Sequence, residues 1–234
     1  MDALTAPRLS VVMPTLNEAA RIATRLVELR RLGGLYEVIV VDGGSSDDTV
    51  AIAEAFPEVR VLRAPPGRAS QMNAGAAVAR GDVILFLHAD VSLPLDALDH
   101  VARTMSDPRA VAGAFRTWTV ADLGSSMPAP LLHLADIRSR CSGLPYGDQA
   151  IFVRAAIFHE LGGFPDLPIL EDLRMSQKLQ ARGRVVTCPA SVRVSGRRFL
   201  SRPLFYLALM NLFPLLARLG VPLPMLARTY GVVR

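Results

Sequence analysis

Short apolar runs alternate with amphipathic stretches along the first hundred residues. Four runs are rich in β-branched or large apolar residues and end at polar or turn residues, which is typical of buried strands; they cover residues 9–13, 37–41, 59–62 and 83–87. The stretches between them have apolar residues at helical spacing. They predict helices capped by Asn17 and by Ser45 or Ser46, and further helices at 69–79 and 94–105. This alternation predicts an α/β fold, with a parallel sheet covered by helices on both faces.

The second half of the chain is less regular. It predicts a strand at 110–119, a loop at 122–130, a helix at 131–140, a short strand at 151–154, a helix ending at Gly162-Gly163, a helix at 170–182 and strands at 185–188 and 191–194. No linker or internal repeat interrupts this order. We therefore expect one domain over residues 1–200 and a C-terminal helical appendage over residues 201–234.

Charge is distributed unevenly along the 234 residues. Residues 1–172 contain all 21 Asp and Glu residues and 15 arginines, whereas residues 173–234 contain ten arginines, Lys178 and no acidic residue. Between Arg202 and Arg218 lies an uncharged apolar stretch, which is too short to cross a bilayer comfortably. It is long enough either to lie on a membrane surface between arginines or to pack on the domain. The sequence leaves both interpretations open.

Composition excludes several classes of protein. A hydrophobic content of 51% excludes a disordered chain, and two cysteines cannot form a disulfide framework or a cysteine-rich zinc site. The N-terminus lacks a basic start and an apolar core of signal-peptide length. We expect a cytoplasmic protein, with contact at the inner face of the cell membrane as a further expectation. The basic tail has few aromatic residues among its arginines, so we expect no nucleic acid as a partner.

Candidate chemistry follows three of the predicted strands, where ligands of open α/β sheets bind. These segments are Pro14–Glu18, Asp42–Thr49 and His88–Asp90. Carboxylates there can accept hydrogen bonds from a base or ribose, and glycines let the backbone approach a ligand. The same residues can equally serve as helix caps and turns. No glycine-rich phosphate loop with a lysine is present, which excludes a Walker-type ATPase.

Taken in order, five motifs point to a known family. PTLNE, VVDGGSSDDT, GRASQMNAGAAVARGDVILFLHAD, GDQAIFVRAAIFHELGGF and a later ED resemble a family 2 glycosyltransferase with the GT-A fold, a Rossmann-like nucleotide-binding sheet flanked by helices. The resemblance covers about residues 9–200. The HAD and GDQ spellings and the run Ser195–Arg198 are similar to a bacterial subgroup linked to arsenosugar biosynthesis.

The resemblance implies a nucleotide-sugar donor, with a UDP-sugar as the leading candidate. Arg197 and Arg198 stand where related enzymes place a basic motif near the diphosphate. The family's usual QxxRW motif is absent, and Phe199 occupies the aromatic place. The other residues that the resemblance assigns to the donor are Pro14, Asn17, Glu18, Asp42, Gly43, Arg68, Asn73 and Asp90.

The resemblance also implies a divalent metal, Mn²⁺ or Mg²⁺. Asp90 matches the last aspartate of the family's DXD motif, and His88 replaces its first acid. Aspartate oxygen suits either cation, whereas imidazole favours Mn²⁺. A solvated Asp90 beside a half-buried His88, with no metal between them, is the structural alternative.

Asp172, in the pair with Glu171, matches the catalytic base of the family, and either carboxylate can serve the chemistry. With a single base to take the proton of the attacking hydroxyl, the leaving group is displaced directly. Direct displacement implies inversion at the anomeric carbon of the sugar. A helix N-terminus favours a negative charge there, and complementing the helix dipole is the structural alternative. The acceptor is expected to be lipid-linked or a small molecule, bordered by Gly147, Asp148 and Gln149.

Two other functions compete with this interpretation. A nucleotidyltransferase on a related fold would carry a glycine-rich N-terminal loop with a basic residue, and Pro14–Glu18 has neither. A non-catalytic nucleotide- or membrane-binding homologue is favoured by the altered HAD motif. Release of a nucleoside diphosphate, of pyrophosphate or of neither would separate the three.

Overall fold

The computed structural model describes residues 7–34, 36–120, 133, 136, 139, 143–197, 212–213, 216–217 and 219–230. The predicted loop at 122–130, most of the predicted helix at 131–140, and Arg198 lie outside the described residues.

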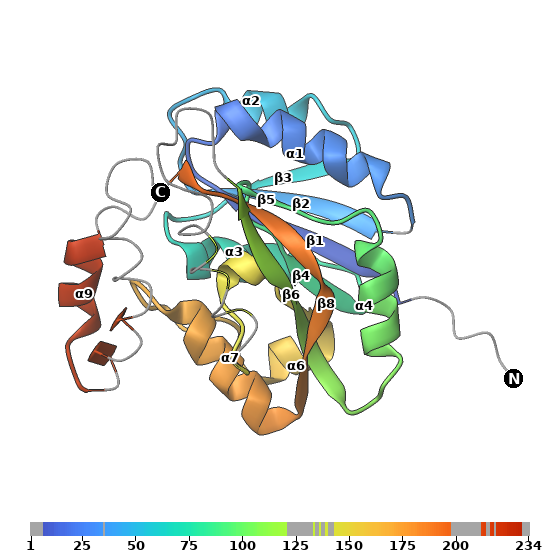
Figure 1. Cartoon of the computed structure of the whole chain (residues 1–234). Coiled ribbons are helices and arrows are strands. Elements are labelled where there is room, and N and C mark those ends of the chain that lie inside the picture. The colour runs from blue at the N-terminus through green and yellow to red at the C-terminus, as the bar shows by residue number, and fades with distance from the viewer. Residues whose placement is uncertain are drawn as a thin grey trace, which may run out of the picture.

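The described strands form one eight-stranded mixed sheet, shown in Figure 1. Its order is β3 (Val59–Arg63), β2 (Tyr36–Asp42), β1 (Leu9–Thr15), β4 (Val83–Phe86), β7 (Phe152–Arg154), β6 (Ala110–Val120), β8 (Arg184–Ser195) and β5 (Val91–Ser92). The first four strands are parallel, as the sequence predicts. Strand β7 is antiparallel to both β4 and β6, so the sheet changes direction in its middle.

Helices cover both faces of the sheet (Figure 1). One face packs against α1 (Ala19–Arg31), α2 (Thr49–Glu54) and α4 (Ala97–Met105), and the other against α3 (Arg68–Val78), α6 (Ala155–Glu160) and α7 (Glu171–Arg182). Side chains alternate along β1, so Met13 joins the first core with Leu26 and Val12 joins the second with Met72. Because both cores are buried, the strands are held in place, and so are the strand ends that carry the polar segments.

Two predicted helix caps are wrong. The Asn17 side chain does not cap α1: its Oδ1 accepts a hydrogen bond from the Ser46 backbone N–H at 2.9 Å. The backbone N–H of Ala19, the first residue of α1, donates instead to Oδ2 of Asp47 at 3.1 Å. Neither serine begins α2, because that helix starts at Thr49, whose N–H donates to Oδ1 of Asp47 at 3.0 Å. One aspartate therefore holds the starts of two helices.

A third prediction also differs from the structure. The strands predicted at 185–188 and 191–194 are one strand, β8, paired in parallel with β6. Thr187 pairs with Ala114 and Ser191 with Arg116, so the pairing register shifts around Pro189. A proline removes one backbone donor, and an irregular register accommodates this loss without ending the strand.

The C-terminal helix α9 (Leu223–Tyr230) packs on the domain through Leu226, which is buried in a small cluster with Ile169 and Phe213. Ile169 directly precedes Leu170, the residue that caps α7. Other apolar side chains of this region face outward, and Met225 is 65% exposed. Among the described residues, no helix has both the length and the apolar character needed to cross a membrane.

Candidate active site

A cleft opens at the carboxyl ends of β1 and β4, beside the N-terminus of α3. Its walls include six residues that the sequence assigns to donor or metal: Pro14, Glu18, Arg68, His88, Asp90 and Arg197. The remaining walls are Thr15, Leu16, Gly67, Gln71 and Ala89. Two of the three segments predicted to carry chemistry, Pro14–Glu18 and His88–Asp90, therefore meet in one cleft. Arg197, more than a hundred positions further along the chain, joins them there.

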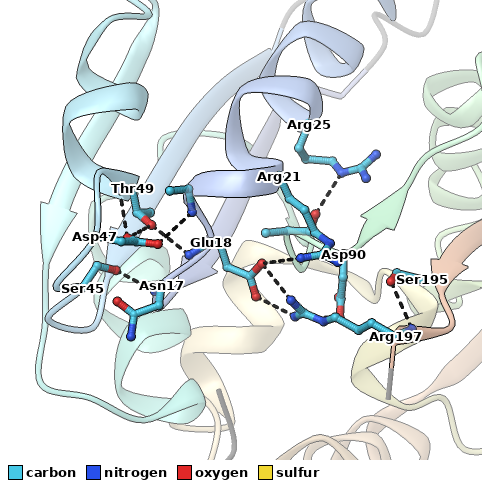
Figure 2. A network of polar contacts seen from close by, with 12 residues as sticks. Asn17, Glu18, Arg21, Arg25, Ser45, Asp47, Thr49, Asp90, Ser195 and Arg197 are labelled. Carbon is cyan, nitrogen blue, oxygen red and sulfur yellow. Dashed lines mark hydrogen bonds and ion pairs between the residues drawn. The ribbon is translucent and has the colours of Figure 1, made fainter. Parts of the chain in front are cut away.

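Arg197 bridges two carboxylates in this cleft, as Figure 2 shows. Its Nη1 and Nη2 donate to the two carboxylate oxygens of Glu18 at 3.0 and 2.6 Å, and Nη2 also donates to Oδ2 of Asp90 at 3.1 Å. Burial opposes the charge of Arg197, but the hydrogen bonds and the negative charges of Glu18 and Asp90 outweigh it and raise its pKa. The guanidinium is therefore a fixed positive charge at the cleft.

The loop after β2 is held from within by Asp42. This side chain is 2% exposed, and its Oδ2 accepts hydrogen bonds from the N–H groups of Gly44 and Ser45, both at 2.9 Å. Ser45 in turn accepts a hydrogen bond from the Asn17 N–H at 2.9 Å (Figure 2). The structure thus gives Asp42 and Asn17 a clear role in shaping the loop, and neither lines the cleft.

Asp172 lies next to the cleft, at the first turn of α7. The Gly147 N–H donates to its Oδ2 and the Leu173 N–H to its Oδ1, both at 2.7 Å. A methyl group on Gly147 would lie 3.3 Å from that Oδ2 and 2.9 Å from Nε2 of His88. The imidazole and the carboxylate therefore face the same small space, separated only by a residue without a side chain.

Glu171 is buried at 4% exposure and faces Arg68, with 3.8 Å between its Oε1 and the arginine Nη1. Burial, and then the charge of Asp172, raise the pKa of Glu171 to about 7, against the opposing effect of Arg68. The two neighbouring acids thus differ: Asp172 presents its carboxylate toward His88, whereas Glu171 ties α7 to the start of α3.

Of four other predicted residues, two make structural hydrogen bonds, Asn73 and Gln149. Asn73 donates through Nδ2 to the Phe164 carbonyl at 2.8 Å and accepts from the Phe164 N–H at 2.9 Å. Gln149 is buried and donates to the Phe115 carbonyl at 2.9 Å. A methyl group on Gly43 would lie 2.9 Å from Cδ of Gln71. Asp148 follows Gly147 in the short helix η1 (Gly147–Gln149), half-buried.

Sequence reasoning missed Gln71, which organises the floor of the cleft. It is 4% exposed and donates through Nε2 to the carbonyls of Thr15 and Val41, at 2.7 and 2.8 Å. These carbonyls belong to the ends of β1 and β2, so one side chain joins both strand ends to α3. The signal in the sequence is a pair of amides, Gln71 and Asn73, in an otherwise alanine-rich helix.

Asp90 and His88 both line the cleft and offer one carboxylate and one imidazole. Over the described part of the chain, no group of three or more His, Cys, Asp or Glu side chains is placed to hold a metal by itself. Two protein ligands suit a cation that is held jointly with substrate phosphates and water, as Mg²⁺ usually is. The residues therefore fit a metal that binds together with a diphosphate, after Asp90 exchanges its contact with Arg197.

These features define an α/β protein with a polar cleft at its strand ends and a carboxylate beside that cleft. The family model described as glycosyl transferase family 2 matches residues 10–160, and the chain belongs to this family. Its fold is the GT-A fold that the sequence predicts.

Curated relatives agree with the family. A PGL/p-HBAD biosynthesis glycosyltransferase of Mycobacterium bovis is 30% identical over 184 residues, which is 69% of this chain and 64% of the relative. An undecaprenyl-phosphate 4-deoxy-4-formamido-L-arabinose transferase of Pseudomonas paraeruginosa is 27% identical, over 62% of this chain and 46% of the relative. The chain thus spans less than two thirds of the length of these relatives. Neither name supports the arsenosugar subgroup.

Solved structures share the fold. S. aureus TarS 1-349 in complex with UDP-GlcNAc has a TM-score of 0.66 at 21% identity, covering 81% of this chain and 59% of that one. The mannosyltransferase PcManGT from Pyrobaculum calidifontis, in complex with GDP-Man and Mn²⁺, has a TM-score of 0.66 at 21% identity, covering 97% and 70%.

Proposed function

We propose that this protein transfers a sugar from a nucleoside diphosphate donor, a UDP-sugar first, to an acceptor hydroxyl with inversion at the sugar carbon. One observation carries the proposal: the Asp172 carboxylate faces His88 across Gly147, at the edge of a cleft formed by strand ends. A donor whose diphosphate lies in the cleft would present its sugar toward this space. The names of the relatives and of the structural neighbours support the donor class.

Arg197 and Arg68 are the positive charges for the leaving diphosphate. Both line the cleft, and both contact carboxylates in this structure. Donor phosphates would compete with those carboxylates for the guanidinium groups, and preorganised positive charge stabilises the negative charge that builds on the leaving group. Arg198, the next residue in the sequence, is proposed to assist Arg197. The part of the cleft that binds the nucleotide is proposed to be formed or shaped by Pro14, Asn17, Glu18, Asp42, Gly43 and Asn73.

Asp90, with His88, would hold Mn²⁺ or Mg²⁺ together with the diphosphate. The cation would supply Lewis-acid stabilisation of the leaving group. The Mn²⁺ in the mannosyltransferase complex supports this choice. We expect His88→Ala to change the relative activity with Mn²⁺ and Mg²⁺, measured as rates over a range of each cation. An unchanged preference would remove His88 as a ligand.

Asp172 is proposed as the general base that takes the proton of the attacking hydroxyl. Two backbone N–H groups fix its carboxylate, and a positioned base typically contributes about 10²–10⁴-fold to the rate. Glu171, buried against Arg68, is the alternative carboxylate for the general base. Gly147 to Gln149 are proposed to border the acceptor, since Gly147 lies between the base and His88.

Asp172→Asn tests the base directly. We expect nucleoside diphosphate release to fall by at least about 10²-fold, with nucleotide binding by calorimetry nearly unchanged. Asp166→Asn is the matched control, because Asp166 is exposed and precedes α7 by a few residues. Full turnover in Asp172→Asn would remove this residue as the base. Configuration of the product, read by NMR, tests inversion separately.

The C-terminal segment is proposed to touch the inner face of the cell membrane, and the acceptor to be lipid-linked or a small molecule. Leu219 and Met225 are 72% and 65% exposed, and Arg228 lies on the same helix as Met225. A lipid phosphate appears in the name of the arabinose-derivative transferase, which supports the first acceptor class. Met225→Ser should weaken sedimentation with phosphatidylglycerol vesicles. Leu95→Ser, which also replaces an exposed apolar side chain but lies far from the C-terminal segment in the sequence, should not. An acceptor screen tests the arsenosugar resemblance.

A further inference from the structure

A second cavity borders Asp90 and does not include His88 among its described walls. Its volume is about 230 Å³, and its walls come from α1, β5, the end of β6 and β8. Asp90 is the one wall residue that it shares with the donor cleft among the described residues. We call it the arginine pocket, because Arg21, Arg25 and Arg193 line it.

Positive charge exceeds negative charge in this pocket. The two carboxylates in its walls are Glu28 and Asp90, and each already contacts a guanidinium, Glu28 that of Arg25 and Asp90 that of Arg197. Arg193 is exposed, and within the described part of the chain no hydrogen bond or ion pair engages its side chain. The pocket therefore presents a cation whose charge no described carboxylate balances.

Arg25 fixes the floor of the pocket. Its side chain is 9% exposed, its Nε donates to the Ala89 carbonyl at 3.3 Å (Figure 2), and its Nη1 contacts Glu28 and Ser92. Burial lowers its pKa most strongly. The charges of Glu28 and Asp90 raise that pKa, and those of Arg193 and Arg21 lower it. Arg193 and Arg21 thus each lie close enough to repel the Arg25 guanidinium, and an anion among these side chains would relieve that repulsion.

Hydroxyl groups complete the lining. Thr24, Ser92 and Ser195 all contribute to the walls, so hydrogen-bond donors accompany the charges. The volume equals that of roughly eight waters at about 30 Å³ each. A phosphate group with part of the molecule that carries it has this size, and guanidinium groups are the side chains that best match its oxygens.

We propose that the arginine pocket binds a phosphate group, separately from the donor cleft. The phosphate is either free in solution or part of a lipid headgroup. Arg193 and Arg21 close on its oxygens from two sides of the pocket, and the hydroxyls donate from the walls. This site does not rest on the proposed transfer reaction. Asp90 is a wall that it shares with the donor cleft, but the groups proposed to contact the phosphate, Arg193, Arg21 and the hydroxyls, have no assigned role toward the base or the nucleotide.

Calorimetric titration of the full chain with inorganic phosphate, at constant ionic strength, tests whether the pocket binds phosphate that is free in solution. We expect saturable binding that weakens about tenfold or more in Arg193→Gln, because hydrogen bonds to charged groups are the strong ones. Arg31→Gln is the matched control, since Arg31 is an exposed arginine at the other end of α1. Thermal unfolding in chloride checks that each variant folds.

Sedimentation with phosphatidylglycerol vesicles, against phosphatidylcholine vesicles, tests the lipid source with the same variants. Loss of vesicle binding in Arg193→Gln, without any effect of inorganic phosphate, assigns the site to a headgroup. Binding of neither probe overturns the proposal. So does a result in which neither phosphate binding nor vesicle binding is weaker in Arg193→Gln than in the native protein.

Discussion

Glu171→Gln should stabilise the fold in a manner that depends on pH. The native carboxyl is buried, next to the charge of Asp172, and its pKa is raised from the ordinary 4.5 to about 7. Glutamine has nearly the shape of the protonated acid and cannot ionise. The substitution therefore removes the cost of an ionised group in a buried position while leaving the packing almost intact.

The sign follows from the two protonation states. Below about pH 4.5 the carboxyl is protonated in both the folded and the unfolded chain, so the substitution changes no ionisation energy. Above that pH the unfolded chain loses the proton first, and the folded state carries a growing penalty until its own pKa near 7 is passed. At about 1.4 kcal/mol for each pKa unit, the penalty reaches roughly 3 kcal/mol at pH 8.

Urea unfolding at several pH values between about 5 and 8 measures this difference. The free energy of unfolding of Glu171→Gln, minus that of the native protein, should rise by roughly 2.5 kcal/mol across the range. Glu160→Gln is the control, because Glu160 is exposed and its hydrogen bond with Arg182 lowers its pKa. Its difference should not rise with pH. A difference for Glu171→Gln that is flat over the same range would refute the reasoning.

Three further substitutions test other contacts. Arg197→Gln leaves the buried carboxylate of Glu18 and the half-buried one of Asp90 without their common partner. It should lower the free energy of unfolding by about 3 kcal/mol, measured in urea, and a loss below about 1 kcal/mol would contradict the bridge. Gly75→Ala places a methyl group 2.4 Å from Cγ1 of Val12 and should destabilise the core by about 1–3 kcal/mol; an unchanged melting temperature would show that the core yields there. Gly147→Ala should reduce turnover by about 10²-fold with little change in nucleotide binding, because its methyl group meets His88; native turnover would argue against the shared space.

The parallel half of the sheet could be predicted because its strands are short, apolar and separated by helical patterns. The start of α1 could not, because the side chain that holds it, Asp47, lies 28 residues after Ala19 in the chain. Local rules search for a cap next to the helix and so select Asn17. The cap that the structure uses depends on two strand ends lying side by side.

The candidate site shows the same limit. The carboxyl-end rule places Glu18, His88 and Asp90 together, and the cleft confirms that these residues meet. The position of Asp172 beside His88 depends on Gly147, which brings η1 between them, and no periodicity in the sequence reports that contact. Gln71 was missed because its amide acts on backbone carbonyls, which have no sequence signature.

The uneven charge of the chain acquires a structural meaning at Arg197. This arginine belongs to the acid-free last part of the sequence and binds Glu18 and Asp90, two acids of the first part. The two parts are thus joined at the cleft by charge as well as by strand pairing. A ligand with phosphate groups meets a positive charge that is already held in place.

Release of nucleoside diphosphate by the purified protein tests the central claim most directly. The native chain and Asp172→Asn would each be incubated with a panel of nucleotide sugars, with Mn²⁺ and an acceptor mixture, and assayed for nucleoside diphosphate and for pyrophosphate. We predict nucleoside diphosphate release from at least one donor by the native chain and loss of that release in Asp172→Asn. Release of pyrophosphate would instead indicate a nucleotidyltransferase. Nucleotide binding without turnover of any donor would indicate a non-catalytic homologue, and either result would contradict the proposed transfer.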